Sequence, residues 1–125
     1  MSRINMNSGF QVPAQKLKTF PVELTTSLAD IYTADAYRKP SLASIHVVNK
    51  TAGALTFDLV YYNGTTDFYL AKTHALAASD TFTLQSNDDH FMSLEEGYKI
   101  KALGSANTSI DCFVSVYESE GRRTT

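Results

Sequence analysis

The sequence predicts an all-β chain, an antiparallel β-sandwich of jelly-roll-like form with about eight short strands and an extended N-terminal arm. Two patterns carry this prediction. Apolar and polar residues alternate in several short segments, and turn-forming residues separate these segments. Because side chains of a strand point alternately to its two faces, such alternation indicates one buried and one wetter face. The clearest pair, residues 98–102 and 110–116, flanks a glycine–serine–asparagine turn.

The final segment shows the alternation best, with Asp111 and Ser115 on one face and apolar residues on the other. The expected inward residues are Ile110, Cys112, Val114 and Val116. Upstream, residues 41–49 form a strong strand with Ala43, Ile45 and Val47 on one face. Residues 28–32, 54–62, 66–71 and 80–84 are the other expected strands.

A tight hairpin is expected at Asn63-Gly64, because asparagine and glycine tolerate the positive φ that such turns require. Phe57 and Phe68, on either side of this turn, are expected to fill the core. Residues 71–78 (AKTHALAA) could instead form a helical turn on propensity alone. Leu94 to Gly97 is expected to form a bend before the last two strands.

Residues 1–21 are expected to form an extended arm, followed by a β-sandwich over 22–118 and a flexible tail over 119–125. The arm contains polar and helix-breaking residues, including Pro13 and Pro21. A free polar tail has no need of hydrophobic side chains, so this segment is expected to order against its own body or a neighbouring subunit. A frayed terminus is the alternative. The arm's candidate interaction residues are Ile4, Phe10, Val12, Leu17 and Phe20.

Composition limits the partners and the compartment. The chain has 125 residues, 43% of them apolar, which suits one globular domain. A net charge of −2 with scattered basic residues argues against a nucleic-acid partner. Cys112 is the only cysteine, so no intramolecular disulfide can form, which favours folding in a reducing compartment. No signal peptide or membrane-spanning run is visible, so we expect a protein that is made in the cytoplasm and stays there or leaves by cell lysis, with no membrane partner.

No catalytic, cofactor-binding or metal-binding set is expected. His46, His74 and His90 lack the close spacing of zinc motifs, and the loop 85–90 does not match a calcium loop. Glu95 and Glu96 are adjacent on an extended chain and face apart, which does not suit paired acid–base work. The sequence contains no nucleophile elbow and no phosphate-binding glycine loop.

The tyrosines suggest contact surfaces. Tyr62 and Tyr69 are expected on the outer face of the hairpin, and Phe113 and Tyr117 on the outer face of the last strand. Tyrosine combines contact area with a polar tip, so outward tyrosines are typical of an interface. A sugar-stacking platform and simple cross-strand stabilisation are the alternatives.

The segment order KTAGALTFDLVYYNGTTDFYLAK, LAASDTFTL and SLEEGYKIKALGSANTSIDCFVSVYE resembles small β-sandwich structural proteins of tailed bacteriophages. The resemblance covers residues 28–118 and includes the bend at 94–97, the "IKA" strand and the closing Tyr117-Glu118. It implies a non-enzymatic virion component, most simply an auxiliary capsid (decoration or cement) protein. Head–tail connector (neck) or tail accessory proteins, and a carbohydrate-binding sandwich for host recognition, are alternatives. The implied partners are copies of itself and other virion proteins, such as the major capsid, connector or tail subunits.

Overall fold

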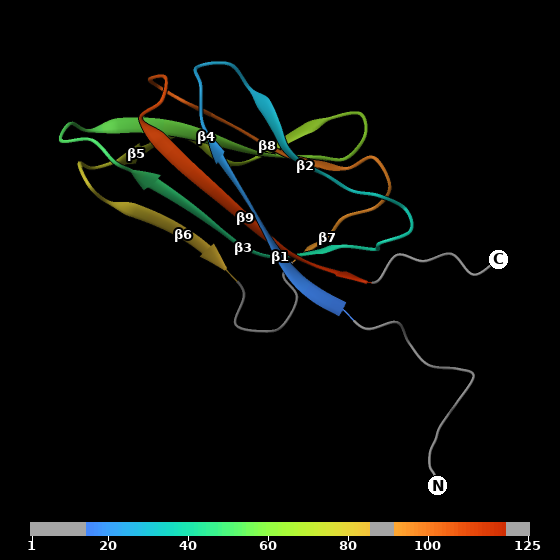
Figure 1. Cartoon of the computed structure of the whole chain (residues 1–125). Coiled ribbons are helices and arrows are strands. Elements are labelled where there is room, and N and C mark those ends of the chain that lie inside the picture. The colour runs from blue at the N-terminus through green and yellow to red at the C-terminus, as the bar shows by residue number, and fades with distance from the viewer. Residues whose placement is uncertain (1–14, 86–91, 120–125) are drawn as a thin grey trace, which may run out of the picture.

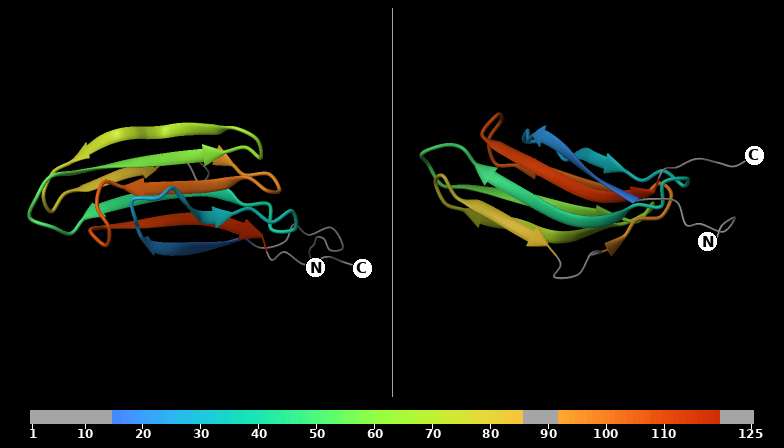
Figure 2. Two further views of the ribbon diagram at one scale, coloured as in Figure 1. Left: turned by 90° about the horizontal axis from the view of Figure 1, so that it is seen from above. Right: turned by 60° about the horizontal axis from the view of Figure 1, so that its bottom comes forward.

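The computed structural model describes residues 15–85 and 92–119, which form two antiparallel sheets packed face to face (Figures 1 and 2). One sheet has the order β1-β9-β3-β6, with β7 also paired to β3, and the other has the order β2-β8-β4-β5. The strands are β1 Gln15–Glu23, β2 Ala29–Thr33, β3 Ser41–Asn49, β4 Leu55–Tyr62, β5 Asp67–Leu76, β6 Thr81–Gln85, β7 Met92–Ser93, β8 Lys99–Gly104 and β9 Ile110–Ser119.

The strand order is that of a jelly roll. The β4–β5 hairpin lies at the centre of the pairing, and around it β3 pairs with β6, β2 with β8 and β1 with β9. Nested antiparallel pairs of this kind amount to one long hairpin that is rolled so that its strand pairs alternate between two sheets. The predicted fold class, an antiparallel sandwich of jelly-roll type, is confirmed.

The core lies between the sheets and contains the residues that the alternation placed inward. Ile110, Val114 and Val116 of β9 are fully buried, as are Phe57 and Leu59 of β4. Fully burying such a side chain contributes about 1.5–3 kcal/mol, so β9 and β4 are major contributors to the core. None of the described residues forms a helix long and apolar enough to cross a membrane.

The predicted hairpin forms around residues 63–66, between β4 and β5. Gly64 has φ +95°, a conformation that favours glycine. The side-chain Oδ1 of Asn63 accepts hydrogen bonds from the backbone N–H groups of Thr65 at 3.1 Å and Thr66 at 2.8 Å. Asparagine therefore stabilises this loop through its side chain.

For β5, one alternative is excluded and one expectation is wrong. The helical alternative for residues 71–78 fails because β5 continues as a strand to Leu76, interrupted by Thr73 with φ +47°. Phe68 was expected in the core but is 52% exposed. β5 is the edge strand of its sheet, so its side chains have a neighbouring strand on one side only.

Strand β3 differs from the prediction at its start. Its register with β9 shifts between Leu42 and Ser44, which places Leu42, rather than Ala43, among the buried residues. Ile45 and Val47 lie inward as expected. A bulge of this kind adds one residue to a strand and reverses the facing of the residues before it.

The expected segment boundaries fall inside strands. Residues 15–23 form β1, which pairs with β9 from Gln15 opposite Ser119 to Glu23 opposite Asp111, so the boundary after residue 21 lies within this strand. Strand β9 likewise extends through Ser119. Residues 1–14 and 120–125 lie outside the described residues. The described chain thus begins and ends side by side, at the same end of the sandwich.

Candidate interaction faces

The structure describes six of the nine candidate interaction residues and places them in three locations. Leu17, Phe113 and Tyr117 lie on the outer face of the β1-β9-β3-β6 sheet, and Tyr62 and Tyr69 on the outer face of the other sheet. Phe20 points inward, where its ring centroid lies 5.0 Å from that of Tyr32. Ile4, Phe10 and Val12 lie outside the described residues.

On the β1-β9-β3-β6 sheet, cross-strand pairs bring the apolar candidates together. Leu17 of β1 is opposite Tyr117 of β9, and two residues further along Thr19 is opposite Ser115. The next pair on this face is Pro21 with Phe113. Leu17 is 56% exposed, and Phe113 and Tyr117 are partly exposed. We call this surface the apolar face; it comprises Leu17, Thr19, Pro21, Phe113, Ser115, Tyr117, Ser44, His46 and Thr83.

Polar groups within the apolar face are paired with one another. The hydroxyls of Thr19 and Ser115 lie 2.8 Å apart, and Nδ1 of His46 lies 3.1 Å from Oγ1 of Thr83. Such local pairing lowers the cost of removing these groups from water when another surface covers them.

Charged side chains gather beyond one end of the apolar face. Lys50 Nζ donates to Glu23 Oε2 at 2.5 Å and to Asp111 Oδ1 at 3.0 Å. These hydrogen bonds raise the pKa of Lys50, and the one with Glu23 has the larger effect. The ion-pair cluster forms a charged margin next to an otherwise uncharged surface.

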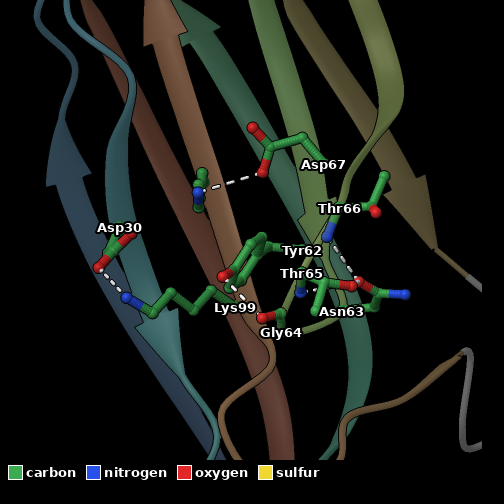
Figure 3. Close-up of polar contacts among 9 residues, drawn as sticks. Asp30, Tyr62, Asn63, Gly64, Thr65, Thr66, Asp67 and Lys99 are labelled. Atoms are coloured by element: carbon green, nitrogen blue, oxygen red, sulfur yellow. Dashed lines mark hydrogen bonds and ion pairs between the residues drawn. The ribbon is translucent and has the colours of Figure 1, made fainter.

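The opposite outer face has different chemistry (Figure 3). Lys99 Nζ lies 2.8 Å from Asp30 Oδ2, and Lys101 Nζ lies 3.1 Å from Asp67 Oδ1. The lysines also cover the aromatic rings, since Lys101 Nζ lies 4.1 Å from the ring centroid of Tyr62. We call this surface the lysine–tyrosine face; it comprises Asp30, Asp58, Val60, Tyr62, Asp67, Tyr69, Lys72, Lys99 and Lys101.

The lysine–tyrosine face already covers its own apolar groups. Val60 is fully buried although it belongs to this outer face, where its cross-strand neighbours are Tyr69 and Lys101. The hydroxyl of Tyr62 donates to the carbonyl of Gly64 at 2.8 Å, and Lys72 Nζ lies 4.7 Å from the ring centroid of Tyr69. Lysine stems and tyrosine rings thus form a layer over the sheet, with charged heads paired to aspartates. Tyr69 remains 47% exposed.

One polar cluster was not predicted from the sequence. Glu118 is only 4% exposed, and its carboxylate accepts a hydrogen bond from the hydroxyl of Tyr32. Lys18 Nζ lies 3.1 Å from the same carboxylate, and Arg38 Nη1 lies 4.0 Å from it. The signal available in the sequence was a glutamate at an inward position of the β9 alternation. This cluster connects β1, β2 and β9.

A hollow at one end of the sandwich is lined by Asp35, Lys39, Pro40, Ser93, Leu94, Glu95 and Glu96. Its lining residues include no histidine or cysteine. Within 15–85 and 92–119, no group of three or more His, Cys, Asp or Glu side chains is placed to hold a metal ion. Cys112 lies in the core, where burial raises the pKa of its thiol to about 12.

No protein-family model matches the chain, and no curated protein matches it in sequence. Solved structures do share its fold. One is from the Bacillus endospore appendages, described as a novel family of disulfide-linked pili: identity is 14%, with 94% of this chain and 98% of that chain covered, at a TM-score of 0.56. Another is from the capsid of Helicobacter pylori bacteriophage KHP30: identity is 10%, with 86% and 90% covered, at a TM-score of 0.55. At these identities the likeness shows the fold alone.

Proposed function

We propose that this chain is a non-enzymatic structural subunit of a virus particle, and more narrowly an auxiliary capsid protein of a tailed phage. The contrast between its two outer faces carries the proposal. The lysine–tyrosine face is charge-paired and covers its own apolar groups, as a solvent-facing surface does. On the apolar face, Leu17 is 56% exposed and Phe113 and Tyr117 are partly exposed beside it, which suits contact with another protein.

The size of the apolar face suggests how it is used. Four strands at about 4.8 Å spacing and six residues at about 3.4 Å give a surface of about 400 Å². A stable protein interface buries about 800 Å² on each partner. The face therefore needs further contact area, which the N-terminal segment or many symmetric copies could add.

The likeness to a phage capsid protein supports the virion assignment, since that solved chain is matched over nearly its whole length. A neck or tail position uses the same kind of contact. The pilus subunits share the fold and are described as disulfide-linked, whereas the single cysteine of this chain lies in the core. A sugar platform needs an open ring face, and Lys101 lies over the ring of Tyr62.

The test is the native mass of the full chain across a concentration series. We expect concentration-dependent association, and Leu17→Asp should raise the dissociation constant about tenfold or more, because a carboxylate would be buried in an apolar contact. Tyr69→Asp, a matched change on the lysine–tyrosine face, should leave association unchanged. A trimer would favour capsid decoration and a ring of six or twelve the neck or tail. A monomer at every concentration would contradict self-assembly.

A further inference from the structure

Each sheet of the sandwich ends in two edge strands, β1 and β6 in one and β2 and β5 in the other. An edge strand directs half of its backbone N–H and C=O groups away from the sheet, where another strand can bind them. Proteins oppose unwanted pairing with prolines, lysines, bulges or short strands. The four edges can therefore be compared for the features that permit or prevent strand addition.

β1 carries a proline at its outer edge. The N–H of Leu24, next to β1, donates to the carbonyl of Ile110 at 2.8 Å, which fixes the alternation of hydrogen bonding along the strand. The backbone N–H and C=O groups of even-numbered residues point toward β9, and those of odd-numbered residues point away from the sheet. Pro21 is odd-numbered, so its missing N–H does not remove a hydrogen bond to β9. It does remove one backbone N–H donor from the outer edge. Lys16 and Lys18 add positive charge to this edge.

β5 and β2 are irregular. The register of β5 with β4 shifts twice near Leu59, and Thr73 in β5 has φ +47°. Strand β2 has a register shift between Asp30 and Tyr32 within its five residues. Bulged and twisted edges pair poorly with a further strand.

β6 is as short as β2, with five residues, but it lacks the other features. Its sequence, TFTLQ, has no charge, proline or glycine, and its register with β3 is unbroken from Thr81 to Gln85. The N–H of Asn49 donates to the carbonyl of Asp80 at 2.9 Å, so even-numbered residues face β3. Thr81, Thr83 and Gln85 therefore direct their backbone groups outward. Asp80 Oδ1 accepts the N–H of Thr81 at 2.8 Å, which leaves two outward donors, those of Thr83 and Gln85.

The side of the sandwich beside β6 is also apolar. Phe82 and Leu84 of β6 are partly buried against the core, as is Leu70 of β5, and Phe68 of β5 is 52% exposed. β5 and β6 are the edge strands on this side of the two sheets, joined by residues 77–80. A strand added to β6 with alternate apolar residues would place them beside Phe82 and Leu84.

Residues 4–12 of this chain have the required sequence. The segment INMNSGFQV has no charge and no proline, and its apolar residues Ile4, Met6, Phe10 and Val12 all stand at even positions. Alternation of this kind is typical of a strand with one apolar face. We propose that residues 4–12 of a neighbouring copy add as a strand to the outer edge of β6, with these apolar side chains toward the sandwich interior.

A neighbouring copy suits this geometry better than the same chain. In its own sheet, β6 lies three strand spacings, about 14 Å, from β1. Only Pro13 and Ala14 lie between this segment and Gln15 of β1, and three residue steps span at most about 11 Å, which is too short to reach β6. This inference rests on the proposed self-assembly, because the added strand comes from a second copy.

Thr83→Pro in the full chain tests the edge directly. The N–H of Thr83 points away from β3, so proline at this position removes an outward donor without breaking the pairing of β3 with β6, as Pro21 does in β1. The matched control is Thr83→Val, since both variants lose the hydroxyl contact with His46 but only proline loses the N–H. We expect Thr83→Pro and Phe10→Asp to raise the dissociation constant about tenfold or more relative to Thr83→Val.

Hydrogen exchange at the amides of Thr83 and Gln85 is the second readout. We expect protection that rises with protein concentration and is lost in Phe10→Asp. Association with fast exchange at both amides would overturn the proposed docking while self-assembly stands. If dilution leaves the protection of these amides unchanged, the chain's own N-terminal segment pairs with β6. That result would overturn the proposal that the added strand comes from a second copy. A wild-type chain that stays monomeric would contradict the self-assembly on which this inference rests.

Discussion

Tyr32 in β2 and Glu118 in β9 connect the two sheets through a hydrogen bond, in which the tyrosine hydroxyl donates to Oε2 at 2.5 Å. Lys18 approaches the same carboxylate from β1. Because Glu118 is nearly fully buried, its oxygens depend on these donors in place of water. The contact therefore joins three strands of the sandwich at the end where the described chain begins and ends.

Tyr32→Phe should lower the free energy of unfolding by about 1–3 kcal/mol, because it removes a donor from a buried carboxylate and leaves the packing of the ring in place. Urea denaturation measures the change. Tyr69→Phe removes a hydroxyl from a half-exposed ring and should change stability by no more than about 0.5 kcal/mol. Equal effects of the two variants would show that the Glu118 contact contributes nothing.

Stability should fall as the pH rises above about 9. Burial raises the pKa of the Cys112 thiol from 9.0 to about 12, so the folded state keeps a proton that the unfolded chain has lost. Burial, and then the hydrogen bond to Glu118, raises the pKa of Tyr32 in the same direction. The raised pKa of Cys112 contributes to the free energy of unfolding in full below about pH 9, and that of Tyr32 below about pH 10. Each contribution is lost as the pH rises further.

Urea unfolding at pH 7 to 10.5 measures this dependence. Each retained proton adds a slope of about 1.4 kcal/mol per pH unit. Cys112→Ala will reduce stability at every pH because of the cavity, but it should delay the onset of the alkaline decline by about one pH unit. An unchanged onset would mean that Cys112 is not the group responsible.

The sequence predicted this fold well wherever alternation was regular, as in β9 and β4. It could not predict the face of Leu42 or the exposure of Phe68, because a bulge and an edge position depend on which strands become neighbours. Leu17, Phe113 and Tyr117 were selected on separate grounds, and only the pairing of β1 with β9 places them on one surface. The burial of Val60 depends in the same way on lysines from β8.

Asn49→Leu should lower the free energy of unfolding by about 3 kcal/mol, because several buried groups lose their partner at once. Asn49 is fully buried, and its Nδ2 donates to the carbonyls of Gly53 at 2.8 Å, Leu76 at 3.1 Å and Ala77 at 3.1 Å. The amide therefore joins two loops at one end of the sandwich. Asn107→Ala is the control: the Oδ1 of its exposed side chain accepts the N–H of Thr26 at 3.0 Å, and the change should cost less than about 1 kcal/mol.

Gly104→Ala should destabilise the fold, whereas Gly53→Ala should not. A Cβ at Gly104 would lie 3.2 Å from Cδ1 of Ile110 and 3.5 Å from Cβ of Leu24, in a core that has little room to adjust. We expect a loss of about 1–2 kcal/mol in the free energy of unfolding, since crowding exceeds the entropy that alanine saves in a strand. At Gly53 no atom lies within 4 Å of the added Cβ, so thermal and urea unfolding should be within about 0.5 kcal/mol of wild type. A stable Gly104→Ala variant would show that Ile110 and Leu24 can move apart, and that this corner of the core is less tightly packed than its geometry indicates.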